Sequence, residues 1–161
     1  MDVFLRPVQP SDIDYLLEWE NNPENWEVSG TKESFTKQQI TDFVNTTHDI
    51  YINKQYRYII CIKKNDKPIG CVDLFEFDEQ QSRVGVGVLI GDLAQRNKGY
   101  ATQSLKLLMD YCRHTLKVKC VFCHIFKENT SSIRLFEKSG FQFVEERELF
   151  EKSVNYYELS L

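Results

Sequence analysis

The apolar residues of this 161-residue chain recur with two different periods, and the change between them is clearest at the centre of the sequence. From Val84 to Val88, valines alternate with glycines, which is the two-residue period of a β-strand with little side-chain bulk on one face. Beyond a polar turn, apolar residues return at helical spacing from Ala101 to Leu116. The centre of the chain therefore predicts a strand, a turn containing Gly99 and a helix.

The same two periods predict the remaining elements. Strands are expected at residues 3–6, 56–63, 69–77, 83–90, 118–126, 141–150 and 154–161, and helices at 100–114, at 131–139 and after Ser11 and Thr36. Ser11 is expected to cap the first helix, with Asp14 completing a capping box. Residues 46–55 are expected to be less regular. The order β-α-α-β-β-β-α-β-α-β-β predicts one α/β (α+β) domain over residues 1–161, with about seven mostly antiparallel strands in a mixed sheet and about four helices.

The turn before the central helix is a candidate anion site. The first N–H groups of a helix have no partner within it, and the helix dipole favours negative charge there. Gly99 would let a ligand approach this backbone, so a phosphate-bearing ligand is expected. No Gly-Lys-Ser/Thr closes the turn and no G-x-G-x-x-G is present, so neither a P-loop nor a dinucleotide fingerprint explains it.

The net charge and the apolar composition of the chain limit the kinds of partner that we expect it to bind. The formal net charge of −4 argues against a general nucleic-acid binder and suits a cationic substrate. No apolar run approaches the roughly 18 residues of a membrane span, and the N-terminus has no signal-peptide layout, so a cytoplasmic protein without membrane contact is expected. Cys120 and Cys123 lie three apart on an expected strand and point to opposite faces, so we expect reduced cysteines and no metal site.

Two sequence motifs occur in the order that one family requires. Arg96-x-x-Gly99-x-Ala101 matches an Arg/Gln-x-x-Gly-x-Gly/Ala signature, and the residues from Asn129 to Phe141 match Asn-x-x-Ala/Ser-x-x-Leu-x-x-x-x-Gly-Phe. Near the N-terminus are Leu5-Arg6-Pro7 and Asp12-x-x-x-Leu16-x-x-Trp19-x-Asn21. Over nearly its whole length the chain resembles the GCN5-related N-acetyltransferase (GNAT) family, in particular the branch acting on polyamines and ribosomal-protein N-termini. The segment 69–77 is most similar to spermidine N-acetyltransferases.

The resemblance implies acetyl transfer from acetyl-CoA, used as a co-substrate, directly to an amine. It places the cofactor against Val88, Leu89, Ile90, Arg96, Asn97, Lys98, Gly99, Tyr100, Ala101, Thr102, Asn129 and Ser132. The Leu89 amide would polarise the thioester carbonyl, and Asn129 would bind the pantetheine arm, serve as a helix N-cap, or do both. The family often has a tyrosine as general acid where this chain has Phe136.

The amine must lose a proton before it attacks, and a carboxylate is the expected acceptor. The candidates for contact with the amine are Glu24, Trp26, Glu27, Asp73 and Glu76, with Asp73 and Glu27 as candidate bases. Asp73 has apolar neighbours on its strand, which predicts a partly buried carboxyl with a raised pKa. The alternative is an Asp paired with a nearby Arg or backbone amide.

Several alternatives stay open at this point. The acceptor could be a polyamine, a protein N-terminus or a small amine such as an amino sugar. A non-catalytic acyl-CoA-binding module is the rival from another class. The expected final hairpin of 141–150 and 154–161 could pair across a homodimer.

Overall fold

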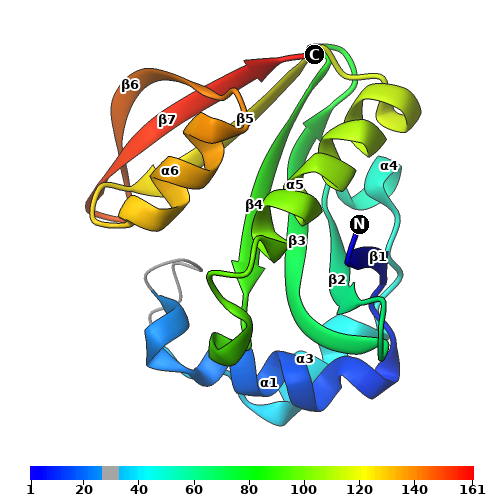
Figure 1. Cartoon of the computed structure of the whole chain (residues 1–161). Coiled ribbons are helices and arrows are strands. Elements are labelled where there is room, and N and C mark those ends of the chain that lie inside the picture. The colour runs from blue at the N-terminus through cyan, green and yellow to red at the C-terminus, as the bar shows by residue number, and fades with distance from the viewer. Residues whose placement is uncertain (27–32) are drawn as a thin grey trace.

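The computed structural model describes residues 1–26 and 33–161, which form a seven-stranded sheet with helices on its two faces (Figure 1). The strands are β1 (Val3–Pro7), β2 (Tyr56–Ile62), β3 (Lys67–Asp78), β4 (Arg83–Ile90), β5 (Cys120–Phe126), β6 (Gln142–Leu149) and β7 (Lys152–Ser160). The helices are α1 (Ile13–Asn21), α3 (Lys37–Asn45), α4 (Ile50–Asn53), α5 (Tyr100–Tyr111) and α6 (Thr130–Lys138). The strands lie in the order β1-β2-β3-β4-β5-β7-β6. The predicted mixed sheet of seven strands is confirmed.

Alternating side chains of β3 and β4 build an apolar cluster on each face of the sheet. Val72 and Val86 face the α5 side and pack in one cluster with Leu105 and Leu108 of that helix. On the other face, Cys71 and Leu89 pack in a second cluster with the buried residues of α1 and α3. These residues are Leu16, Trp19, Ile40 and Val44. The period of two in the strands thus gives both faces a core, and Asp73 shares its face with Cys71.

The sheet opens at its centre, between β4 and β5. Every other neighbouring pair of strands is antiparallel, whereas β4 and β5 are parallel and pair only between residues 83–85 and residues 120–122. Beyond Gly85 the two strands spread apart, and β5, β7, β6 and α6 form a wing that leans away from the rest of the sheet (Figure 1). The part of β4 that follows Gly85 therefore has β3 as a partner on one side and no ladder to β5 on the other.

Two local expectations differ from the structure. The chain enters α1 through a short turn, Pro10–Asp12, that begins after Gln9 rather than at Ser11. Asp12, not Asp14, closes this turn, because its Oδ2 accepts the N–H of Gln9 at 2.9 Å while both its oxygens accept hydrogen bonds from Arg6 at 2.7 Å. The stretch 46–55, expected to be less regular, contains the four-residue helix α4, which Asp49 caps.

The caps of α3 and α6 are formed by residues close in sequence. Thr36 and Gln39 form a capping box at α3, and Asn129 caps α6. Gly140 follows α6 with a φ of +96°, the left-handed conformation that favours glycine.

All five cysteines are free thiols, and burial raises the pKa of Cys71 and of Cys112 to about 12. Among the described residues no group of His, Cys, Asp and Glu side chains is arranged to hold a metal ion. No helix in the ranges 1–26 and 33–161 is long and apolar enough to cross a bilayer.

Asp12 and Asp14 provide a matched test of how α1 is anchored. We expect Asp12→Ala to lower the free energy of unfolding by roughly 2–4 kcal/mol, because it removes the buried partner of Arg6. Asp14→Ala should change it by less than about 0.5 kcal/mol, since Asp14 is 85% exposed and its contact to Lys37 is 3.6 Å long. Urea denaturation of both variants measures the difference, and equal losses would contradict this account.

Candidate functional site

The turn between β4 and α5 is fastened at both ends. Its Asp92 Oδ1 accepts the Ala94 N–H at 3.1 Å, and the Nε of Arg96 donates to the carbonyl of Ile90 at 3.0 Å. Asn97 and Gly99 both have left-handed backbones, with φ of +61° and +81°. A Cβ built on Gly99 would have no described atom within 4 Å. The N-terminus of α5 is therefore open to a ligand, in a turn whose left-handed residues suit anion binding.

A cavity of about 390 Å³ lies against this turn. It is lined by Val88, Leu89, Ile90, Gln95, Arg96, Asn97, Gly99, Tyr100, Ala101, Thr102, Ser131, Ser132, Arg134, Leu135 and Lys138. The cavity thus brings together all of the residues expected to bind the cofactor except Lys98 and Asn129. Lys98 is exposed, with its Nζ 3.2 Å from Gln95 Oε1. Asn129 is buried and caps α6, its Oδ1 accepting the N–H of Ser132 at 3.2 Å.

The sequence motifs did not point to Arg134 and Lys138, which line the cavity from α6. Their spacing of four residues places them on one face of that helix, together with Ser131 and Leu135. That spacing is a signal the sequence contains, although it does not say what the face adjoins.

The cavity fits acetyl-CoA. Three cationic residues, Arg96, Arg134 and Lys138, and a helix N-terminus suit the phosphates of the coenzyme. The side of β4 left without a ladder beyond Gly85 can pair with an extended, amide-bearing arm.

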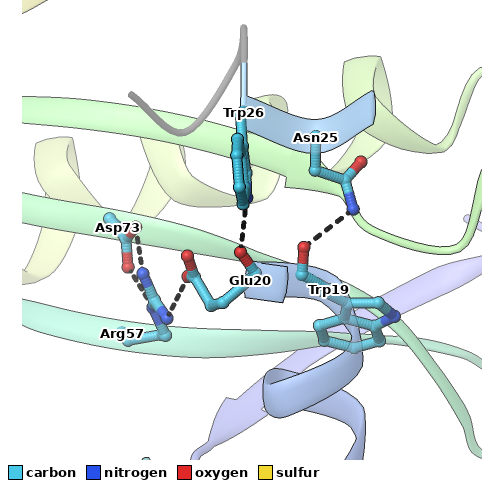
Figure 2. A network of polar contacts seen from close by, with 6 residues as sticks. All are labelled: Trp19, Glu20, Asn25, Trp26, Arg57 and Asp73. Carbon is cyan, nitrogen blue, oxygen red and sulfur yellow. Dashed lines mark hydrogen bonds and ion pairs between the residues drawn. The ribbon is translucent and has the colours of Figure 1, made fainter. Parts of the chain in front are cut away.

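On the face of the sheet that carries Asp73, charged side chains from three elements meet (Figure 2). Arg57 of β2 donates from Nε and Nη2 to the two carboxylate oxygens of Asp73, at 2.7 and 2.9 Å. Its Nη1 donates to Oε1 of Glu20, on α1, at 3.2 Å. The backbone carbonyl of Glu20 in turn accepts the indole N–H of Trp26 at 2.8 Å. Two predicted acceptor-site residues, Asp73 and Trp26, are therefore linked through Glu20 and Arg57, which sequence reasoning missed.

We call Glu20, Arg57 and Asp73 the charged trio. Its formal charges, −1, +1 and −1, sum to −1. Burial lowers the pKa of Arg57, but the charges of Asp73 and Glu20 raise it by more. The pKa therefore lies well above its usual value, and the guanidinium stays charged. The structure thus has the ion pair that was the alternative to an unpaired, apolar setting for Asp73. Any amine that binds Asp73 competes there with Arg57.

The other acceptor-site candidates lie apart from the trio or outside the described residues. Glu24 is exposed, and its N–H donates to Asn22 Oδ1 at 3.0 Å. Glu76 is exposed at an irregularity of β3, with a φ of +49°. Glu27 lies outside the described residues. Phe136 is buried edge-on against Phe141 at 5.0 Å between ring centroids, and it has no proton to donate.

A buried amide connects the two sides of the site. Asn25 is fully buried, and its Nδ2 donates to the carbonyls of Trp19 at 3.0 Å and Gly91 at 3.3 Å. Its Oδ1 accepts a hydrogen bond from Nη2 of Arg96. Figure 2 shows Asn25 beside Trp26, so the segment that carries Trp26 is tied to the cofactor turn. No sequence pattern marks this residue.

The fold and the cavity define a class of protein. The model of the acetyltransferase (GNAT) domain matches residues 2–142, so the chain belongs to the GNAT acetyltransferase family. It is accordingly an N-acetyltransferase that uses acetyl-CoA.

Its relatives include two bacterial proteins of similar length. The chain is 27% identical over 142 residues to the uncharacterized N-acetyltransferase p20 of Bacillus licheniformis. The aligned region covers 86% of this chain and 78% of the relative. It is 26% identical over 141 residues to spermidine N(1)-acetyltransferase of Escherichia coli K12, covering 86% and 72% of the two chains. The fold is similar to that of spermidine N-acetyltransferase from Vibrio cholerae in complex with CoA and spermine. The TM-score is 0.88, with 19% identity and with 99% and 95% of the two chains covered.

Gly99 tests the role of the cofactor turn. We expect Gly99→Val to weaken acetyl-CoA binding by more than about ten-fold, because a branched side chain would stand where the backbone meets the ligand. The φ of +81° adds a strain of about 1–3 kcal/mol for valine, so stability should fall as well.

Gly99→Asn separates the two effects, since asparagine tolerates a left-handed backbone. It should restore most of the stability and little of the affinity. Calorimetric titration with acetyl-CoA measures this, and a folded Gly99→Val variant with wild-type affinity would remove the turn from the site. Arg96→Ala should weaken binding less than Gly99→Val, because main-chain amides are expected to make most of the contact.

Proposed function

We propose that the chain acetylates a primary amine of a polyamine such as spermidine, with acetyl-CoA as donor. The observation that carries the proposal is the charged trio, whose Asp73 carboxylate lies on the β3 face beside β4, the strand that lines the cofactor cavity. A protein N-terminus or an amino sugar has a single cationic group, whereas a polyamine has a second one that the trio would attract. The relatives named as spermidine N-acetyltransferases support the same acceptor.

Acetyl-CoA supplies an acyl group activated as a thioester. In the proposed reaction the amine nitrogen forms a C–N bond to the acyl carbon, the C–S bond breaks, and the nitrogen gives up a proton. An alkylammonium with a pKa near 10.4 needs about 4.6 kcal/mol to exist as the free amine at pH 7, so a proton acceptor at the site would lower the barrier. Asp73 is proposed either to accept this proton, directly or through water, or to anchor the second ammonium group. Glu27 remains a second candidate base.

Two further roles are proposed on the cofactor side. Leu89 lies in the wall of the cavity on β4, and its amide N–H is proposed to donate to the acyl oxygen, where a fixed donor lowers a barrier by about 3 kcal/mol. No side chain is required to protonate the leaving sulfur at the position of Phe136. A thiol pKa near 8.5 makes release of the thiolate at pH 7 unfavourable by only about 2 kcal/mol, and water can supply the proton.

Self-association is proposed at the end of the sheet formed by β6. This strand closes the order β5-β7-β6, and its Phe143 and Val144 are 55% and 48% exposed. A Vibrio cholerae spermidine N-acetyltransferase of similar fold is described as dodecameric. A homodimer across β6 would cover these apolar side chains.

Asp73→Asn distinguishes the proposed roles of the carboxyl group. If Asp73 accepts the proton, kcat should fall by about 10²–10⁴ at pH 7, and the defect should shrink as the pH rises, because more of the amine is then free base. If Asp73 anchors a second cation, KM for spermidine should rise while a monoamine is unaffected. Release of free CoA thiol, measured from pH 6 to 10 on both amines, separates the two.

The matched control is Glu79→Gln, which removes an exposed carboxylate from the turn after the same strand and should leave both amines unaffected. Unchanged kcat/KM of Asp73→Asn on spermidine and on the monoamine would remove Asp73 from the site. A wild-type protein that acetylates only amines with a single cationic group would contradict the polyamine proposal.

A further inference from the structure

Three glycines, Gly85, Gly87 and Gly91, lie in β4 or directly after it. Aromatic rings lie against two of them, Gly85 and Gly91. A Cβ built on Gly85 would lie 2.3 Å from the ring of Phe75, and one on Gly91 would lie 2.2 Å from the ring of Trp19. These two glycines are needed for close packing. Gly87 is different: a Cβ built there would have no atom of the described residues within 4 Å.

Neither packing nor backbone conformation explains the glycine at position 87. Its φ lies outside the left-handed region, which among the described glycines is found at Gly99 and Gly140. A glycine in the interior of a strand weakens that strand. The residue is therefore placed at a cost to stability, at a point where a Cβ would have no described atom within 4 Å.

That open space has well-defined neighbours. Gly87 and Asp73 are direct cross-strand partners, so their Cα atoms lie about 4.5–5.5 Å apart and they share one face of the sheet. Along the same face, Leu89 and Cys71 are covered by α1 and α3, whereas Gly87 is half-exposed. The next residues along β4, 88–90, line the cofactor cavity, and the strand has already separated from β5.

We propose that the space over Gly87 is the passage through which the amine reaches the acyl group, and that the absence of a side chain there sets the size of amine accepted. This inference rests on the proposed function. An alkylammonium lying across Gly87 has the charged trio on one side and the cofactor cavity on the other. The substrate class it implies is a linear primary alkylammonium, with a methylene chain that lies against the bare strand.

A series of substitutions tests the passage. Gly87→Ala and Gly87→Val should fold with an unchanged or raised Tm, because the space is open and valine favours strands. Acetyl-CoA affinity should stay within about two-fold of wild type. The kcat/KM for spermidine should fall in the order Ala then Val, by more than about ten-fold for Val, as expected when a few methyl groups fill a substrate site. The loss for the smaller 1,3-diaminopropane should be less.

Gly85→Ala is the matched control, because its methyl group meets the ring of Phe75 rather than open space. It should lower the Tm without a selective loss for the larger amine. A Gly87→Val variant with wild-type kinetics on both amines would overturn the passage. So would an equal loss on both amines that follows from weaker acetyl-CoA binding, since the space would then belong to the cofactor.

A binding measurement keeps this inference separate from the proposed function. Calorimetric titration of spermidine into the protein saturated with CoA requires no turnover. Weaker binding by Gly87→Val than by wild type supports the passage, whether or not the wild-type protein acetylates spermidine. A wild-type protein that binds spermidine but transfers no acetyl group to it would contradict the polyamine proposal alone. Equal affinities of the two proteins for spermidine, or no spermidine binding by either, would contradict the proposed passage.

Discussion

The site depends on a three-residue parallel ladder between β4 and β5. A longer ladder would close the sheet and satisfy the backbone of both strands, whereas this one stops at Gly85 and leaves one side of β4 without a strand partner. Unpaired strand edges are normally costly in the middle of a sheet, since they expose hydrogen-bonding groups that a partner would satisfy. Here the separation creates room for a ligand that can pair with the strand. The cofactor cavity and the space over Gly87 both border this opening.

The charged trio holds the other side of the site together. It joins α1 to two strands of the sheet through one guanidinium with two carboxylate partners. Burying charges costs solvation free energy, which is offset when the geometry is good and the hydrogen bonds are complete. Arg57 meets these conditions with bidentate pairing to Asp73 and a third bond to Glu20.

The sequence predicts best what is encoded by neighbouring residues. The order of elements follows from apolar periodicity, and the residues that line the cavity come from two segments, 88–102 and 131–138, so one motif marks each. The helix α4 was missed because four residues are too few to display a helical period. The start of α1 was misplaced because Asp12 is engaged by Arg6, six residues away, and a local capping pattern contains no information on that contact.

The acceptor side was less predictable for the same physical reason. Glu20, Arg57 and Asp73 come from three elements and meet only when α1 packs on the sheet. A sequence motif could single out Asp73 by its apolar neighbours, but not the arginine that pairs with it.

Asn25 has a consequence for how this protein can be altered. Its single side chain bonds to the end of α1, to the residue after β4 and to the guanidinium of Arg96, so hydrogen bonds join the segment near Trp26 to the cofactor turn. A loop exchanged between homologues to change amine preference would not be a modular replacement unless it kept an asparagine at this position. If binding of one ligand changes these hydrogen bonds, thermodynamic linkage requires the affinity for the other ligand to change by the same factor.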